Sequence, residues 1–188
     1  MRALLFVMLF AATARADDPV YIHAELDPLT FALRGYGGQV GFRFPQLHGV
    51  RFAVASFALN APDLVTQLNG NDGFHEKVLP CGAFYALYYF SPAAHDGFAA
   101  GFSVRYLREE YTRDGFDTFD DIKEISPEAI VGYQWHPFHN GFYLQPWLAL
   151  GVSVYKNHDA VVGNVKYDPL PVSPFFTINV GYEQPLTP

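Results

Sequence analysis

The sequence has little cysteine, few charged residues and almost no long apolar runs. Cys81 is the single cysteine, so an intrachain disulfide and a thiolate metal site are both excluded. Charged residues make up only 16% of the chain. Beyond residue 16, no window approaches the roughly 18 consecutive apolar residues that indicate a membrane-spanning helix. A helical membrane protein is therefore excluded, and a sheet must supply the stability of the fold.

The one sustained apolar run lies at the start of the sequence. A basic residue precedes the run Ala3–Ala12, and a small-x-small motif ends at Ala16. The run is about half the roughly 20 residues that a spanning helix needs, so a retained anchor is the lesser alternative. We therefore expect a signal peptide over residues 1–16, cleaved after Ala16, and a single exported domain over residues 17–188.

Acidic residues outnumber basic ones. Without residues 1–16 the chain keeps 10 basic and 19 acidic side chains, a net charge of −9. This balance excludes a nucleic-acid-binding protein of the usual basic kind. The length predicts one domain, and no linker-like or low-complexity stretch divides it.

Apolar residues alternate with small or polar ones at a period of two, in segments of about ten residues, which is a strand pattern. The segments are residues 36–44, 50–59, 79–90, 98–107, 128–136, 142–155 and 176–183. The connections 45–49, 91–97 and 137–141 are short, whereas 60–78, 109–123 and 156–169 are long and polar. Short turns at one rim and long loops at the other are typical of outer-membrane barrels.

An even number of strands is needed if both chain ends lie on the periplasmic side, so the seven segments predict an eighth, for which residues 20–26 are the candidate. We therefore predict an all-β protein, an eight-stranded up-and-down antiparallel transmembrane β-barrel. Eight strands leave an interior just wide enough for side chains to fill. The connection 27–35 is unusually apolar for a loop. The alternative is a soluble periplasmic barrel or sandwich whose apolar face points inward to a core or ligand cavity.

The alternation also predicts two groups of side chains. Charged and amide side chains on the second face would pair across a low-dielectric lumen, as a polar network made of Arg43, Arg51, Arg105, Glu128, Gln134, Gln145 and Glu183. Aromatic side chains beside the short turns would form a belt at the periplasmic interface, made of Phe42, Phe44, Phe90, Phe98, Trp135, Phe138 and Phe142. A narrow pore lined by the network is an alternative function.

Two segments carry a family resemblance. The hairpin segment 132–147, which reads GYQWHPFHNGFYLQPW, and the segment 24–28, AELDP, resemble a group of uncharacterised bacterial outer-membrane β-barrel domain proteins. With the alternation, the resemblance covers most of the chain after residue 16. It implies the fold and an outer-membrane location, and it implies no activity.

The last segment is similar to the C-terminal signal that directs barrels to their assembly. That signal usually ends the chain at an aromatic residue, whereas residues 183–188 follow Tyr182 here. The expected partners are thus the barrel-assembly machinery, outer-membrane lipids and lipopolysaccharide. We expect a monomer that binds no nucleic acid.

No catalytic motif is found, and no cofactor or metal site is predicted. His136 and His139 have a spacing that can hold a metal, but they flank Pro137 in a tight turn without a neighbouring cysteine or carboxylate in sequence. His75, His95 and His158 stand alone in loops or turns, so we expect them to be solvated.

An acyl hydrolase of the Ser-His-acid kind is the alternative from another class. Ser103, Glu128 and His136 could share the lumen, where they would form a lipid-A-modifying hydrolase or transferase site if His activated Ser. Such a lumen-facing trio would be hidden from lipid, and it is more simply a hydrogen-bonded filler. We therefore expect no enzyme activity, and a structural or surface-interaction role.

The segment 109–124 is the most acidic part of the sequence. It carries seven carboxylates, Glu109, Glu110, Asp114, Asp117, Asp120, Asp121 and Glu124, against Arg113 and Lys123. Hard divalent cations prefer oxygen ligands, so cation-mediated contact with lipopolysaccharide or a surface partner is a hypothesis for this segment. A plainly solvated acidic loop is the alternative.

Overall fold

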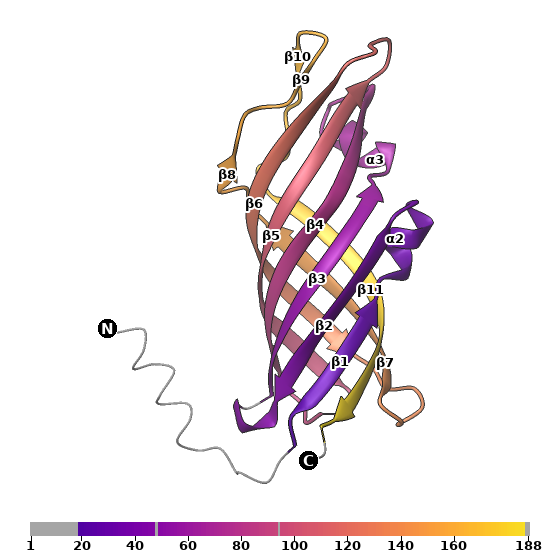
Figure 1. Cartoon of the computed structure of the whole chain (residues 1–188), viewed down its shortest axis with the longest axis vertical. Helices are drawn as coiled ribbons and strands as arrows, with labels where there is room; N and C mark the ends of the chain where they lie inside the picture. The colour runs from indigo at the N-terminus through magenta and orange to yellow at the C-terminus, as the bar shows by residue number, and fades with distance from the viewer. Residues whose placement is uncertain (1–18, 48, 94, 187–188) are drawn as a thin grey trace, which may run out of the picture.

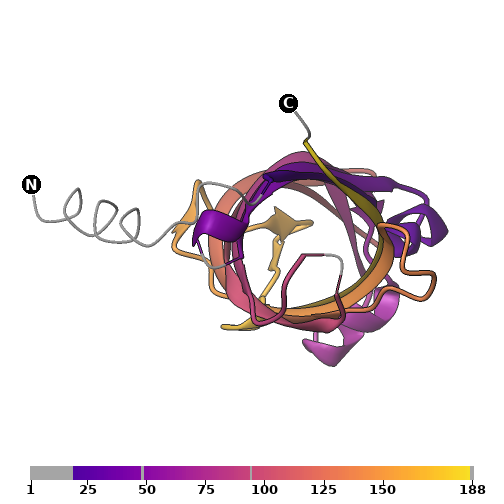
Figure 2. The same ribbon diagram turned by 90° about the horizontal axis from the view of Figure 1, so that it is seen from below.

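The computed structural model describes residues 19–47, 49–93 and 95–186, and the predicted signal peptide lies outside these residues. Eight antiparallel strands close into one barrel (Figures 1 and 2). They are β1 (Tyr21–Leu26), β2 (Tyr36–Phe44), β3 (Val50–Asn60), β4 (Phe74–Tyr89), β5 (Gly97–Arg113), β6 (Phe119–Gln134), β7 (Phe142–Gly151) and β11 (Ser173–Pro185). Pairing of β1 with β11 and of β5 with β6 closes the sheet. The predicted eight-stranded up-and-down barrel is confirmed, including its eighth strand at β1.

The two faces of the sheet differ as the period of two requires. Val40, Val54 and Phe102 on the outer face are exposed, whereas Arg43 and Arg51, opposite each other on β2 and β3, are buried inside. The alternative with an inward apolar face is therefore wrong. If the apolar face pointed inward, Arg43 and Arg51 on the opposite face would be exposed on the outside of the barrel.

The two ends of the barrel are built differently. Short connections, including the 3-10 helix η2 (Pro45–Leu47), lie at the end where β1 begins and β11 finishes, which we call the turn end. The opposite end, called the extended end, carries the helices α2 (Pro28–Ala32) and α3 (Asp63–Leu68) and the small strands β8 (Tyr155–Lys156), β9 (Val161–Val162) and β10 (Val165–Lys166) (Figure 1).

The prediction of a long loop over residues 109–123 is wrong. Strand β5 continues to Arg113 and β6 resumes at Phe119, so the two strands form a tall hairpin. Outward-facing Arg108 pairs with Lys123 in the ladder just beyond Tyr106 and Ile125, the last apolar outward pair. The outward side chains of this hairpin are charged, so its sequence resembles that of a loop. They show instead that the two strands continue beyond the apolar part of the outer face.

Two other connections also differ from the expected loops. The apolar segment 27–35 contains α2, which Asp27 caps by accepting a hydrogen bond from the backbone N–H of Leu29 at 2.9 Å, and Phe31 remains exposed. Strand β7 ends at Gly151, before the predicted boundary at residue 155. The chain nevertheless stays beside β6, because the backbone N–H groups of Val152 and Val154 donate to carbonyl oxygens of β6 before β8 pairs with it.

Among the described residues, no helix has the length and apolar character required to cross a bilayer.

Candidate functional site

The centre of the lumen is organised around Glu25 of β1. Its buried carboxylate accepts hydrogen bonds from Tyr143 Oη at 2.6 Å and from Asn179 Nδ2 at 2.6 Å, and it also bonds to Arg51 and Gln39. Strands β1, β2, β3, β7 and β11 therefore all meet at one carboxylate. A charge in a low-dielectric interior is stable only when it is paired and hydrogen-bonded in this way.

Arg51 of β3 connects this centre to the opposite wall. Its guanidinium donates to Gln145 Oε1 at 3.1 Å and to Gln134 Oε1 at 3.4 Å. The same group lies 4.4 Å from the centroid of the Tyr89 ring, a cation–π contact. The several N–H donors of the Arg51 guanidinium thus link side chains on opposite sides of the lumen.

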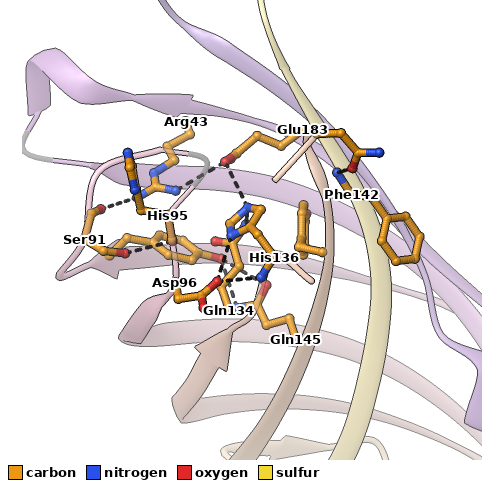
Figure 3. Close-up of polar contacts among 12 residues, drawn as sticks. Arg43, Ser91, His95, Asp96, Gln134, His136, Phe142, Gln145 and Glu183 are labelled. Carbon is orange, nitrogen blue, oxygen red and sulfur yellow. Dashed lines mark hydrogen bonds and ion pairs between the residues drawn. The ribbon is translucent and has the colours of Figure 1, made fainter. Parts of the chain in front are cut away.

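A second group of polar side chains closes the turn end (Figure 3). Arg43 lies 3.5 Å from Glu183 and donates to the backbone carbonyl of Ser91, which belongs to the turn after β4. Asp96 in the same turn accepts the backbone N–H of His136 at 2.6 Å. The turn between β4 and β5 is therefore folded across this end and bonded to the lumen side chains.

A third group lies toward the extended end. Arg105 of β5 forms an ion pair with Glu128 of β6, and Ser103 Oγ donates to Glu128 Oε2 at 2.6 Å. The Arg105 guanidinium lies 5.5 Å from the centroid of the Phe175 ring.

The structure buries all seven side chains of the predicted lumen network and divides them among these three groups. Arg43 contacts Glu183, Arg105 contacts Glu128, and Arg51 joins the two glutamines. The central acceptor, Glu25, is absent from the prediction, although it alternates with Ala24 and Leu26 in β1. Tyr143 is also absent from the predicted network: alternation places it on the face of Gln145, but the prediction counted only charged and amide side chains.

One glycine makes room for this arrangement. A Cβ atom on Gly181 of β11 would lie 2.4 to 2.6 Å from the Tyr143 ring. The ring can therefore reach Glu25 only because position 181 carries no side chain.

The aromatic side chains predicted as a belt lie on the outer face around the turn end. Phe42, Phe90, Phe98, Trp135 and Phe138 are exposed, and Phe44 and Phe142 are partly buried. Tyr88 packs against Phe90 and Tyr133 packs against Phe98, with ring centroids 4.9 and 5.1 Å apart. The predicted set therefore leaves out tyrosines that extend the same ring of aromatic side chains.

The structure does not assemble a Ser-His-acid trio. Ser103 donates a hydrogen bond to Glu128. His136 follows Glu128 by eight residues, which corresponds to roughly 25 Å along an extended strand. At that position His136 contacts Asp96 and Gln134 instead. The expectation that His136 lacks a carboxylate neighbour is wrong, because Asp96 and Glu183 approach its ring in space at 3.5 and 3.9 Å.

Two of the histidines predicted to lie alone in loops or turns are less isolated than expected, and His75 belongs to β4. His75 lies between Asp114 and Asp63, at 3.0 and 2.8 Å, and these hydrogen bonds raise its pKa. His158 lies 2.9 Å from Asp120. Residues far apart in sequence meet here because α3, β4 and the β5–β6 hairpin share the extended end.

The acidic segment 109–124 is divided between the inside and the outside of the barrel. Glu109 and Glu124 are buried, with Tyr111 donating to Glu109 at 3.0 Å and Lys156 3.1 Å from Glu124. Asp114 and Asp117 lie exposed at the hairpin tip. Among the described residues, no group of three or more His, Cys, Asp and Glu side chains is arranged to hold a metal ion.

A cavity of about 380 Å³ lies at the extended end, above Arg105. Its walls are mainly apolar, with side chains such as Leu59, Val78, Leu107 and Phe175, and three carboxyl side chains also line it, Glu76, Glu109 and Glu124. Below it, a pocket of about 30 Å³ lies between Glu25 and Arg105, enough for one or two waters. The large cavity was not predicted, because its lining comes from α3, five strands and the segment after β7.

Stability is expected to fall as the pH rises through the range in which Glu76 ionises. Burial, followed by the carboxylates of Glu109 and Glu124, raises the pKa of Glu76 from 4.5 to about 8. Because the pKa of Glu76 is raised in the folded state, the protonated side chain contributes to the free energy of unfolding. This contribution is fully present below about pH 4.5 and is lost as the pH rises through 8. Urea unfolding of the reconstituted protein at pH 5 and pH 8.5 measures this loss.

The matched variants are Glu76→Gln and Glu110→Gln. Glu76→Gln should flatten the pH dependence, whereas Glu110→Gln on the outer face of β5 should leave it as in the wild type. Equal pH profiles for wild type and Glu76→Gln would contradict the prediction.

Three solved structures are similar to this chain. They are Neisserial surface protein A (15% identity, TM-score 0.51), the N-terminal β-barrel domain of Pseudomonas aeruginosa OprF (15%, 0.49) and a major outer membrane protein from Thermus thermophilus (14%, 0.47). The alignments cover 89%, 89% and 88% of this chain and 97%, 98% and 98% of those chains. No family model and no curated protein sequence matches the chain. The chain thus has the fold of the small eight-stranded outer-membrane β-barrels, as its sequence resemblance implied.

Proposed function

We propose that this chain is a monomeric outer-membrane protein that neither conducts ions nor catalyses a reaction, and that acts by binding at its extended end. The observation that carries the proposal is the filled lumen, in which Arg51 spans from Glu25 to Gln145 and Gln134. Because Glu25, Arg51 and the two glutamines are hydrogen-bonded to one another across a narrow barrel, this central network offers neither a free charge for ion transfer nor a free acid or base for catalysis.

The outer face supports the placement in a membrane. On β5 the outward side chains from Phe98 to Tyr106 are apolar, and this matches the roughly 9–11 residues with which a tilted strand crosses a bilayer. Aromatic side chains gather around the turn end, where an interface would lie. Short turns are typical of the periplasmic side, so the extended end would face outward, toward lipopolysaccharide.

Planar-bilayer recording tests the closed lumen. Wild-type protein inserted into the bilayer is expected to show no discrete conductance steps, because ions would have to pass the paired Glu25 and Arg51. Heat-modifiable migration on a gel verifies that the inserted protein is folded. Regular conductance steps from protein that migrates as a folded barrel would overturn the proposal in favour of a narrow pore.

A further inference from the structure

The wall of the barrel is incomplete beside the large cavity. Strand β1 pairs with β11 only from Tyr21↔Pro185 to Leu26↔Val180, whereas β11 continues to Ser173. Residues 173–179 are therefore paired with β7 on one side and with no strand of the described chain on the other. Helix α2 lies next to this edge (Figure 1).

The cavity reaches the outer face through this gap. Phe176 of β11 points outward, with 56% of its surface exposed, and it nevertheless lines the cavity together with Leu33, which follows α2. Phe176 pairs with Leu148, another exposed apolar side chain, so the opening lies at the level of the apolar band. A ligand could therefore enter sideways, from the surrounding lipid.

The polar lining of the cavity holds three carboxyl groups, those of Glu76, Glu109 and Glu124, and two cations, Arg105 and Lys156. Lys156 is paired with Glu124 and Arg105 is paired with Glu128, so neither cation is left for the other two carboxyls. Glu109 receives only the Tyr111 hydroxyl, and no hydrogen bond or ion pair to the side chain of Glu76 is found in the described part of the chain. The cavity therefore combines an apolar wall with two carboxyl groups, those of Glu76 and Glu109, for which the described residues supply no ion pair.

We propose that the cavity binds a single-chain amphiphile with a primary ammonium head group, which enters from the membrane between α2 and β11. The chain packs against Leu59, Leu107 and Phe175, and the ammonium group donates to Glu76 and Glu109. A volume of about 380 Å³ lies within the usual range for ligand sites, about 300–1,000 Å³. This inference rests on the proposed membrane location.

Quenching of Trp147 measures this binding. Its ring packs against Phe175 with centroids 5.6 Å apart, and Phe175 lines the cavity. The full chain carrying Trp135→Phe, in lipid nanodiscs at pH 8.5, where Glu76 is mostly ionised, is titrated with 12-bromododecylamine. We expect saturable quenching, and at least about tenfold weaker binding of 12-bromododecanoate, whose head group has the opposite charge.

Two variants test the assigned groups. Glu76→Gln combined with Glu109→Gln should weaken amine binding about tenfold or more and leave binding of 12-bromododecanol unchanged. Leu107→Phe, which fills the cavity, should weaken binding of both compounds. The chain carrying Trp147→Phe, which retains Trp135 at the turn end, should show only the linear quenching caused by partition into lipid.

Equal affinity for the amine and the carboxylate would overturn the proposal, and so would the absence of saturable quenching in a folded barrel. Brominated phospholipid in the same nanodiscs separates this failure from failure of the membrane placement. Quenching of Trp135 by that lipid supports the placement even if the amine does not bind. If neither tryptophan is quenched, the membrane placement itself fails.

Discussion

Replacing Arg51 with methionine is expected to lower the free energy of unfolding by about 3–5 kcal/mol. The change leaves the Glu25 carboxylate buried without its charged partner, and methionine offers no donor to Gln145 or Gln134. Losing one member of a buried pair costs more than the pair contributes, because the remaining charge stays desolvated. Urea unfolding from lipid vesicles, extrapolated to water, measures the change.

Two further variants make this result specific. Lys166→Met breaks an ion pair with Asp159 of 2.7 Å at an exposed site, where water screens the two charges, so the free energy of unfolding should hardly change. Adding Glu25→Gln to Arg51→Met removes the buried carboxylate that has lost its partner. The double variant should therefore recover part of the lost free energy of unfolding. If Arg51→Met were no more harmful than Lys166→Met, Glu25 would not depend on Arg51.

Placing an arginine on the outer face at mid-height, by Val54→Arg, is expected to destabilise the barrel in a bilayer by about 2–4 kcal/mol. Val54 is exposed and pairs with Val40 and Phe84, which are also exposed and apolar. In the proposed placement the new charge would lie in hydrocarbon. Equilibrium folding into lipid vesicles provides the measurement.

The control for this prediction is Thr112→Arg. Thr112 also faces outward, but it lies on the part of β5 that extends beyond Arg108, so its substitution should change the stability by less than about 1 kcal/mol. Equal and small effects at both positions would mean that water, rather than lipid, surrounds the apolar band.

The sequence predicts the barrel well because the side-chain period of a strand is independent of its neighbours. Alternation places Phe102 outside and Arg105 inside whatever strand pairs with β5, and the parity of strands then identifies β1. The heights of the strands were harder to predict. Beyond Tyr106 the outward side chains become charged, and a strand in water has the same composition as a loop.

The partners within the lumen could not be predicted for a different reason. Alternation assigns a side chain to a face but gives no register between strands distant in sequence, so it cannot show that Tyr143 reaches Glu25, 118 residues away. The cavity depends on even more distant segments, and on the position where β1 stops pairing with β11. Such features depend on closure of the whole sheet.

The unequal heights of the strands have a consequence for how a ligand would reach this protein. The tall hairpin of β5 and β6 stands on one side, while β1 ends at Leu26 on the other, so the cavity opens toward the band of Leu148 and Phe176. For a barrel placed in the membrane as proposed, occupancy would follow the concentration of the ligand within the lipid leaflet. A compound that partitions strongly into lipid would therefore saturate the site at an aqueous concentration far below its intrinsic dissociation constant.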